Sequence, residues 1–335
     1  DVLLDATLVM GTGEIYYNCG VRFRGGSSRN SNYGGYRIEL PDGYRYDTYR
    51  EINLNHLNAL NQYMGLKLSQ SLGYGAHGQD VELSRVWLNG QYKNPSSQHI
   101  YVRIEGFDGH IIDRYFDETR GNRYKSDGDQ IYRGDLSYTS NLSEYENNTT
   151  PTWPNTGSYY NYMVSILNPA TVWTELQDLC RTVNRPASEL PTILTNRVDV
   201  RGWARQFALN TCLANNESGW FCPYSTRGDE VRLFADPLTG VFHLFPWDLD
   251  AMLSRTDPGV WLWDHHVHRN ILFNRPMAPY YIGDVLDILD GLMSNANMAE
   301  LWDSMGSSLA SQSSIRSSWQ SNLNSLRNNL RNAIY

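Results

Sequence analysis

Val241-Phe242-His243-Leu244-Phe245-Pro246-Trp247-Asp248-Leu249-Asp250 is the stretch that decides the fold of this chain. Its apolar and aromatic first half predicts a strand, which the proline ends. Two carboxylates follow, two positions apart, where extended backbone would point Asp248 and Asp250 to the same side. Such a pair is typical of a Mg2+ site, because this cation takes oxygen ligands and often combines one or two carboxylates with phosphates. The alternative is a turn whose aspartates only cap the next segment.

Composition excludes several classes of protein. With 335 residues, 41% of them hydrophobic, the chain is predicted to form one large domain or two lobes. Its formal net charge of -8 argues against a nucleic-acid partner, because proteins that neutralise phosphates are basic or carry basic stripes. The sequence has no apolar run long enough for a membrane span. Glycosylation sequons at Asn141, Asn147, Asn148 and Asn216 favour a secreted or surface location.

The first part of the chain is predicted to be rich in β-structure. Strand signals cover residues 3–9, 16–23 and 36–40, which are separated by glycine-containing turns. A helix is predicted at 55–72 from apolar residues spaced three and four apart. Two more strands are predicted at 81–88 and 99–104, with Asn89-Gly90 as a hairpin signal between them.

The segment between the second and third predicted strands combines glycines with arginines. Glycine permits close backbone approach, and Arg24, Arg29 and Arg37 are suited to bind an anion bidentately. The segment matches no P-loop pattern. Two interpretations therefore stay open, a cover for phosphates and a hairpin loop with solvated arginines.

The second part of the chain is predicted to be mainly helical. Residues 110–160 are polar and rich in glycine, which predicts a long irregular segment that is a candidate substrate or lid region. Helices are predicted at 171–183, 198–213, 282–293, 298–309 and 314–334. A hairpin of 231–235 and 241–245 interrupts them and delivers Asp248 and Asp250.

The order of these elements is that of a bilobal phosphotransferase. In protein kinases a β-rich lobe with one helix covers the nucleotide phosphates, and a helical lobe supplies a catalytic and a metal-binding aspartate. The predicted fold class is therefore α+β, a bilobal protein-kinase-like fold. Residues 1–110 would form the β-rich, nucleotide-covering lobe, and residues 111–335 the mainly helical lobe with the metal site.

Five blocks of the sequence resemble the signature blocks of the CotH-type (spore coat protein H) atypical protein kinases. They are Val21-Arg22-Phe23-Arg24-Gly25-Gly26-Ser27-Ser28-Arg29, Tyr36-Arg37-Ile38-Glu39-Leu40, Val86-Trp87-Leu88-Asn89-Gly90-Gln91-Tyr92, Arg123-Tyr124-Lys125 and Phe245-Pro246-Trp247-Asp248-Leu249-Asp250. The resemblance runs in register from about residue 1 to 255 and is carried mainly by the first and last blocks. It implies a secreted, cell-surface or spore-surface kinase that binds ATP with Mg2+ and phosphorylates Ser or Thr of secreted or surface proteins.

The resemblance also implies roles for individual residues. Asp248 falls on the metal-binding aspartate of the family, and Asp250 is its companion in the motif. The family's catalytic acid lies in an Asn-x-Asp stretch, which here is Asn215-Asn216-Glu217, so that Glu217 stands where aspartate is expected. The family's lysines before the Tyr-x-Ile block are absent, which leaves Arg24, Arg29 and Arg37 as the phosphate-binding cations. The helix carries Asn61-Gln62 where the family often has Arg-Asn.

Three functional hypotheses follow. The first is an active kinase in which Glu217 positions or deprotonates the acceptor hydroxyl while Asp248 and Asp250 hold Mg2+. The second is a pseudokinase that serves as an extracellular binding module, motivated by the departures from the family pattern. The third is a zinc hydrolase built on Asp264, His265, His266 and His268, although this cluster lacks the His-Glu-x-x-His spacing.

Overall fold

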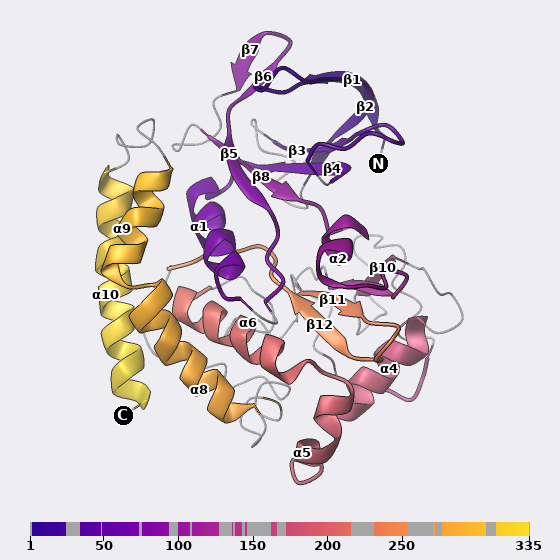
Figure 1. Cartoon of the computed structure of the whole chain (residues 1–335), viewed down its shortest axis with the longest axis vertical. Helices are drawn as coiled ribbons and strands as arrows, with labels where there is room; N and C mark the ends of the chain where they lie inside the picture. Colours follow the sequence, from indigo (N-terminus) through magenta and orange to yellow (C-terminus); the bar gives the residue numbers. More distant parts are fainter. Residues whose placement is uncertain are drawn as a thin grey trace.

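The structure is a computed structural model that describes most of the chain. The described residues are 2–24, 34–47, 49–73, 76–93, 100–107, 109–126, 136, 138–142, 145, 162–165, 172–215, 231–253, 271, 277–305 and 313–334. Together they form a mixed α/β fold with a mainly β N-terminal sheet (Figure 1). The bilobal kinase-like arrangement and its division at residue 110 stay predictions.

The N-terminal sheet has six antiparallel strands. In sheet order they are β1 (Leu4–Val9), β2 (Ile15–Arg24), β3 (Gly35–Glu39), β4 (Glu51–Asn55), β8 (Tyr101–Glu105) and β5 (Val81–Ser84). The three strands predicted before residue 41 are confirmed. Strand β4, which was not among the predicted strands, lies between β3 and β8 and joins the two halves of the sheet.

One face of this sheet is turned toward helix α1 (Ala59–Gln70). Arg24 is paired with Gly35 across β2 and β3, Tyr36 with Leu54 across β3 and β4, and Asn55 with Val102 across β4 and β8, so the side chains of Arg24, Asn55 and Val102 share a face. Val102 belongs to the same buried cluster as the helix residues Leu60 and Met64. Arg24 and Asn55 therefore lie on the side of the sheet that meets the rest of the molecule.

A small hairpin extends from the edge of the sheet. Strands β6 (Val86–Leu88) and β7 (Gln91–Lys93) pair across Asn89 and Gly90, both of which have positive φ (51° and 77°), as a two-residue hairpin turn requires. The turn prediction is thus confirmed, but the long predicted strand 81–88 is broken at Arg85. Strand β8 pairs with β5 rather than across this turn.

A second, four-stranded antiparallel sheet lies below the first (Figure 1). Its order is β10 (Tyr162–Ser165), β9 (Arg123–Ser126), β11 (Val231–Ala235) and β12 (Phe242–Phe245). The predicted hairpin of β11 and β12 is confirmed. The prediction of an irregular segment at 110–160 is wrong for β9 and for helix α2 (Gly109–Tyr115), because β9 gains its pairing only from strands more than thirty residues away in the chain.

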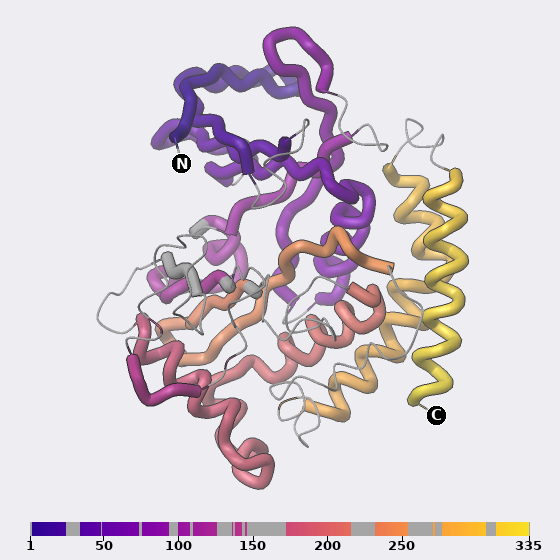
Figure 2. Tube along the Cα trace, turned by 180° about the vertical axis from the view of Figure 1, so that it is seen from behind, coloured from indigo at the N-terminus to yellow at the C-terminus, as the bar shows by residue number. Residues whose placement is uncertain are grey.

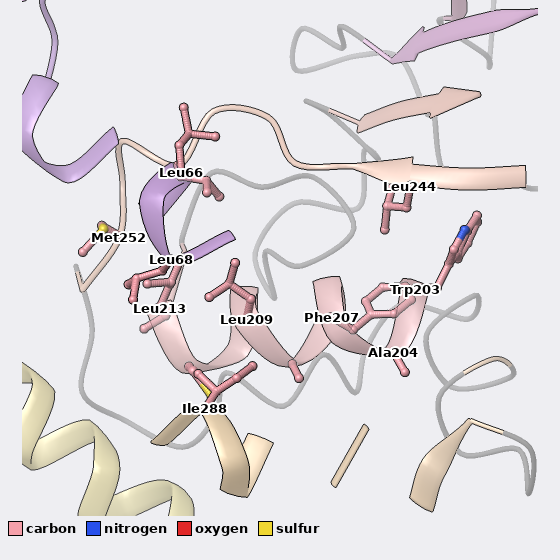
Figure 3. Packing of buried hydrophobic residues seen from close by; sticks show 14 of the residues in the cluster. Leu66, Leu68, Trp203, Ala204, Phe207, Leu209, Leu213, Leu244, Met252 and Ile288 are labelled. Atoms are coloured by element: carbon pink, nitrogen blue, oxygen red, sulfur yellow. The ribbon is translucent and has the colours of Figure 1, made fainter. Parts of the chain in front are cut away.

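Helices cover the second sheet and build the largest core. They are α4 (Val172–Val183), α5 (Leu190–Ile193), α6 (Val200–Leu213), α8 (Ala278–Asp287), α9 (Asn295–Ser304) and α10 (Ser313–Ile334). Figure 3 shows α6 at the centre, with Leu209 and Leu213 between α1 and the segment that contains Ile288, and with Phe207 further along the helix beside Trp203. One buried cluster thus continues from α1 and β8 into the helical part.

The C-terminal helix α10 lies along one side of the molecule beside α9 (Figures 1 and 2). Leu323, Leu326 and Leu330 are buried, and Trp319 meets Trp302 of α9 edge to face with ring centroids 5.1 Å apart. The apolar stripe of α10 is therefore used for docking against the core. Among the described helices, none combines the length and apolar character that crossing a bilayer requires.

Candidate metal and nucleotide site

The Pro-Trp-Asp-Leu-Asp block forms a turn rather than an extended continuation of β12. Asp248 has a φ of 45°, in the left-handed region that aspartate tolerates better than most residues. The expectation that extended backbone presents both carboxylates on one side is therefore wrong. Leu249 is fully buried, and Asp250 is 7% exposed, whereas Asp248 is half-buried. The turn thus anchors its middle in the core and leaves Asp248 as its more accessible carboxylate.

A chain of amide side chains orients Asp248. Asn55 at the end of β4 donates from Nδ2 to Oε1 of Gln62 in α1 at 2.7 Å. Gln62 in turn donates from Nε2 to Oδ1 of Asp248 at 3.3 Å. Because both donors are neutral, they fix the direction of the carboxylate without cancelling its charge. The N-terminal sheet and helix therefore position an acid that lies 186 residues further along the chain.

The backbone of the same turn is tied to two helices. Asn61 of α1 donates to the carbonyl oxygen of Asp250 at 2.9 Å. Asn215, which follows α6, donates to the carbonyl oxygen of Asp248 at 3.3 Å. Met252, just beyond the turn, packs in the same buried cluster as Leu68 of α1 and Leu213 of α6 (Figure 3). The turn is held from both sides, which limits how far its carboxylates can move.

The donor set of the turn fits a hard divalent cation. Asp248 and Asp250 supply carboxylate oxygens, the ligands that Mg2+ prefers, and they do so from one short turn. The amide of Gln62 that donates to the Asp248 carboxylate is neutral, so this hydrogen bond brings no positive charge to the turn. These two residues are therefore suited to hold Mg2+ together with phosphate oxygens and water.

Trp247 connects this turn to two arginines. The guanidinium of Arg24, at the end of β2, lies 5.8 Å from the centroid of the Trp247 ring, and that of the buried Arg232 lies 4.1 Å from it. Both distances are within the range of a cation–π contact. The positive charge of Arg24 also acts on His56: burial is the main cause that lowers the pKa of His56, and the charge of Arg24 is the second cause. The structure thus brings Arg24 next to the Pro-Trp-Asp block.

Arg37 has a different environment. Its guanidinium pairs with Glu39 at 2.9 Å and with Glu51 at 2.6 Å, and the Glu51 carboxylate also accepts a hydrogen bond from Asn53. Two carboxylates therefore share the charge of Arg37 on the surface of the sheet. Two of the predicted phosphate-binding residues, Arg24 and Arg37, are described, and Arg24 is the one that lies beside the Asp248 turn.

Other predicted residues lie outside the described part of the chain. These are Arg29, the catalytic candidate Glu217, and the cluster of Asp264, His265, His266 and His268. Asn215, which opens the Asn-Asn-Glu stretch, is described and is bonded to the Asp248 backbone. Sequence reasoning missed the positioning roles of Asn55 and Gln62, since no periodic pattern marks a contact between residues so far apart.

Comparison with known proteins supports the resemblance found in the sequence. The family model described as CotH kinase protein matches residues 21–331, nearly the whole chain. Comparison with curated proteins gave no significant match. The family match covers the glycine–arginine segment, the amide chain and the Asp248 turn.

Proposed function

Since the chain belongs to the CotH kinase protein family, we propose that it is an atypical protein kinase that transfers the γ-phosphate of ATP to Ser or Thr residues of secreted or surface proteins. The observation that carries the proposal is the Asp248 turn. It is held by Gln62 of α1 on one side and by Asn215 after α6 on the other, with Arg24 beside its tryptophan. Phosphoryl transfer depends mainly on positioning and electrostatics, which is what such a clamp provides.

Each residue has a defined task in this proposal. Asp248 and Asp250 would hold Mg2+, which would neutralise the charge that develops on the phosphate oxygens. Arg24 and Arg29 would bind phosphate oxygens of ATP, since a guanidinium matches their geometry bidentately. Arg37, whose charge is shared with Glu39 and Glu51, would act at longer range.

The chemical step requires a base or a positioning group for the acceptor. The acceptor hydroxyl oxygen bonds to the γ-phosphorus, the bond from that phosphorus to the β–γ bridging oxygen breaks, and ADP leaves. Glu217, two residues after Asn215, would orient the hydroxyl and accept its proton. The longer side chain of glutamate changes the position of this carboxylate relative to the aspartate of the family, so the fit of the acceptor depends on it.

A second candidate function is a pseudokinase that binds a partner without phosphorylating it. The observation that favours it is the uncharged Asn55–Gln62 pair between β4 and α1. In protein kinases the strand before the corresponding helix carries a lysine that pairs with a glutamate of that helix, and both must be in place for activity. An amide pair would preserve the geometry of the lobe but supply no cation to the nucleotide.

The location proposed for either function is outside the cell or on a cell or spore surface. The family resemblance and the sequons support it. Asn141, the acceptor residue of the sequon that begins there, is exposed in the structure, as a glycosylated asparagine must be.

Calorimetric titration with ATP, with and without Mg2+, tests the nucleotide site. We expect Mg2+-dependent binding by the wild-type chain and loss of it in Asp248→Ala. Asp42→Ala is the matched control, because the Asp42 side chain is 90% exposed and is not part of the Asp248 turn. Gln62→Met keeps the side-chain length but cannot hydrogen-bond to Asp248, so the Kd for Mg2+–ATP should rise on the order of 10-fold, equivalent to about 1.4 kcal/mol.

Phosphate transfer separates the two candidate functions. The wild-type chain is incubated with γ-labelled ATP and a mixture of secreted proteins, beside Glu217→Gln. Transfer by the wild-type chain that falls sharply in Glu217→Gln supports the kinase. Mg2+–ATP binding without transfer, or no ATP binding at all, contradicts it and favours the binding module.

A further inference from the structure

A second polar cluster lies apart from the Asp248 turn and joins three segments of the chain. His77 belongs to the segment between α1 and β5, Asp199 caps the N-terminus of α6, and His243 is in β12. Nε2 of His77 is 3.4 Å from Nδ1 of His243, which is 3.3 Å from Oδ2 of Asp199. The three ligand atoms all lie within 4.8 Å of one another.

These distances suit a shared cation better than direct hydrogen bonds. The donor–acceptor distance of a hydrogen bond from an N–H group is most often about 2.9–3.0 Å, and both contacts of His243 Nδ1 are longer than that. In a tetrahedral zinc site with bonds of about 2.0–2.1 Å, two ligand atoms are separated by about 1.6 times the bond length, roughly 3.3–3.4 Å. The two contacts of His243 Nδ1 therefore match the edge of a tetrahedral coordination shell. Nε2 of His77 and the Asp199 carboxylate, which lie within 4.8 Å of each other, would close to the same separation when the ion binds.

Hydrogen-bond accounting leads to the same conclusion. Nδ1 of His243 faces two neighbours but carries at most one proton, so it cannot make a full hydrogen bond to both. If it carries none, its lone pair faces the Asp199 carboxylate. If Nδ1 of His243 carries a proton, Nε2 of His77 must accept it, and the neutral His77 ring then carries its own proton on its Nδ1. That atom is buried and has no hydrogen-bond partner among the described residues. A cation satisfies the lone pairs of all three ligand atoms at once.

The site is preorganised by its surroundings. His77 is 8% exposed and is stacked on Phe245 with ring centroids 4.9 Å apart, and Tyr115 meets it edge to face at 4.8 Å. Phe116 packs on the ring of His243 at 4.6 Å. The other oxygen of Asp199 accepts a hydrogen bond from the Gly202 N–H at 3.1 Å. Ring orientation and carboxylate direction are thus set by neighbours, as around protein metal ligands generally.

The backbone fixes Asp199 and His243 relative to each other. Phe242 donates its N–H to the carbonyl of Arg197, and Asp199 donates its N–H to the carbonyl of Phe242. The start of α6 and β12 therefore form one rigid frame, and His77 closes it from the far side. The side chains of His243 and Asp199 are 15% and 17% exposed, which leaves access for a water molecule as a further ligand.

We propose that His77, Asp199 and His243 bind a zinc ion that clamps α6 and β12 to the segment after α1. Two imidazoles and one carboxylate are borderline donors that favour Zn2+ over Mg2+ or Ca2+. The role is structural, since the three ligands join α6, β12 and the segment after α1, and β12 leads into Pro246 and Asp248. Zinc binding here contributes to folding stability because the unfolded chain does not hold the three ligands together.

Metal analysis and zinc titration of the full, tag-free chain test this proposal. Asp199→Asn is the decisive variant, because asparagine caps a helix as well as aspartate but is a much poorer zinc ligand. We expect one zinc per wild-type chain, a Tm that rises with zinc, and a zinc affinity lowered on the order of 100-fold in Asp199→Asn and in His243→Gln. Cobalt added in place of zinc should give the intense visible absorption of a tetrahedral site only where these ligands are intact.

Two controls keep the outcome unambiguous. His110→Gln removes a histidine of α2 outside the cluster, and the triple variant His265→Gln, His266→Gln, His268→Gln removes the histidines of the alternative zinc motif. Both should bind zinc like the wild-type chain. No zinc binding by the wild-type chain, or zinc lost in the triple variant and retained in a folded Asp199→Asn, would overturn the proposal. Neither result depends on ATP binding, so this test is independent of the kinase proposal.

Discussion

Two polar regions on either side of Phe245 differ in their donor atoms and in the groups that orient them, which are properties that decide which cation a protein binds. The Asp248 turn offers only oxygen donors, is oriented by neutral amides, and keeps Asp248 partly exposed. The cluster around His243 offers two nitrogens and one oxygen within a wall of aromatic rings. An all-oxygen site suits a cation that arrives with its nucleotide, whereas a site with two imidazoles and a carboxylate suits a resident zinc ion. In these proposals β12 would lead at its end into a site for an exchanging Mg2+ ion and would carry a zinc ligand, His243, within the strand.

Phe245 gives the strongest test of this comparison, because its ring packs on His77 and its backbone leads directly into Pro246 and the Asp248 turn. It is 2% exposed, it stacks on His77, and its ring lies 5.1 Å from that of Phe107. Phe245→Ala should lower the free energy of unfolding by about 3–5 kcal/mol, measured by urea denaturation. Affinities for zinc and for Mg2+–ATP should fall together.

A control for this variant is available in the N-terminal sheet. Tyr17 is 64% exposed, so Tyr17→Ala should change stability by no more than about 0.5 kcal/mol. If Phe245→Ala lost less than about 1 kcal/mol, the ring would not be the shared wall that the structure describes. The two sites would then be independent of each other.

A substitution at Gly65 tests the Asp248 turn separately from the His77 cluster, because the atoms nearest to a Cβ placed there belong to Leu249 of that turn. A Cβ atom at Gly65 would lie 2.7 Å from Cβ of Leu249, closer than packed side chains approach. Gly65→Ala in α1 should therefore cost about 1–3 kcal/mol of stability by overpacking, in spite of the better helix propensity of alanine. Mg2+–ATP binding should weaken in a calorimetric titration, while zinc binding should stay unchanged.

The matched control for this variant is Gly283→Ala in α8. No atom lies within 4 Å of a Cβ placed at Gly283, so alanine should raise stability there by up to about 1 kcal/mol. A Gly65→Ala protein as stable as Gly283→Ala would show that Leu249 does not press on α1. In that case the turn would be free to move away from the helix.

The sequence predicted elements that carry a local pattern and missed those that depend on distant partners. The strands β1 to β3, the hairpin of β11 and β12, and the core helices have alternation or three-to-four spacing that is readable in place. β9 is short and polar, and it becomes a strand because β10 and β11 supply its hydrogen bonds. β4 alternates polar and apolar residues, but over only five positions, and its place between β3 and β8 was not predicted. The family resemblance was confirmed because its motifs are local blocks of sequence.

The candidate site shows the same limit at the level of single residues. Asp248 and Asp250 were found from the sequence, but the left-handed backbone at Asp248 was not, since nothing in Pro-Trp-Asp specifies it. Gln62 was noted only as a departure from the family pattern, and its bond to Asp248 explains what an amide does there. The pairing of Arg37 with Glu39 and Glu51 was equally hidden, because a charge pattern does not reveal which acids lie across the strands.

Glu105→Gln should have the smallest effect of these variants, a change in how stability depends on pH. Glu105 lies outside both polar regions, so it serves as a reference for them. Its fully buried side chain, at the end of β8, pairs with Arg114 and accepts the Asp80 N–H at 2.9 Å. Burial raises the pKa of Glu105 above its usual 4.5, although the Asp80 hydrogen bond and Arg114 act in the opposite direction. Arg114 is in α2, the helix that also carries Tyr115 against His77.

The sign of the pH dependence follows from that raised pKa. The folded chain binds the Glu105 proton more tightly than the unfolded chain, so this contribution to stability is fully present below about pH 4.5. It is lost as the pH rises through the folded-state pKa. Urea denaturation across this window should therefore show a flatter pH profile for Glu105→Gln than for the wild-type chain, with zinc and Mg2+–ATP affinities unchanged. If the two profiles were parallel, Glu105 would titrate alike in both states. A change in zinc affinity would instead show that α2 couples this anchor to the His77 cluster.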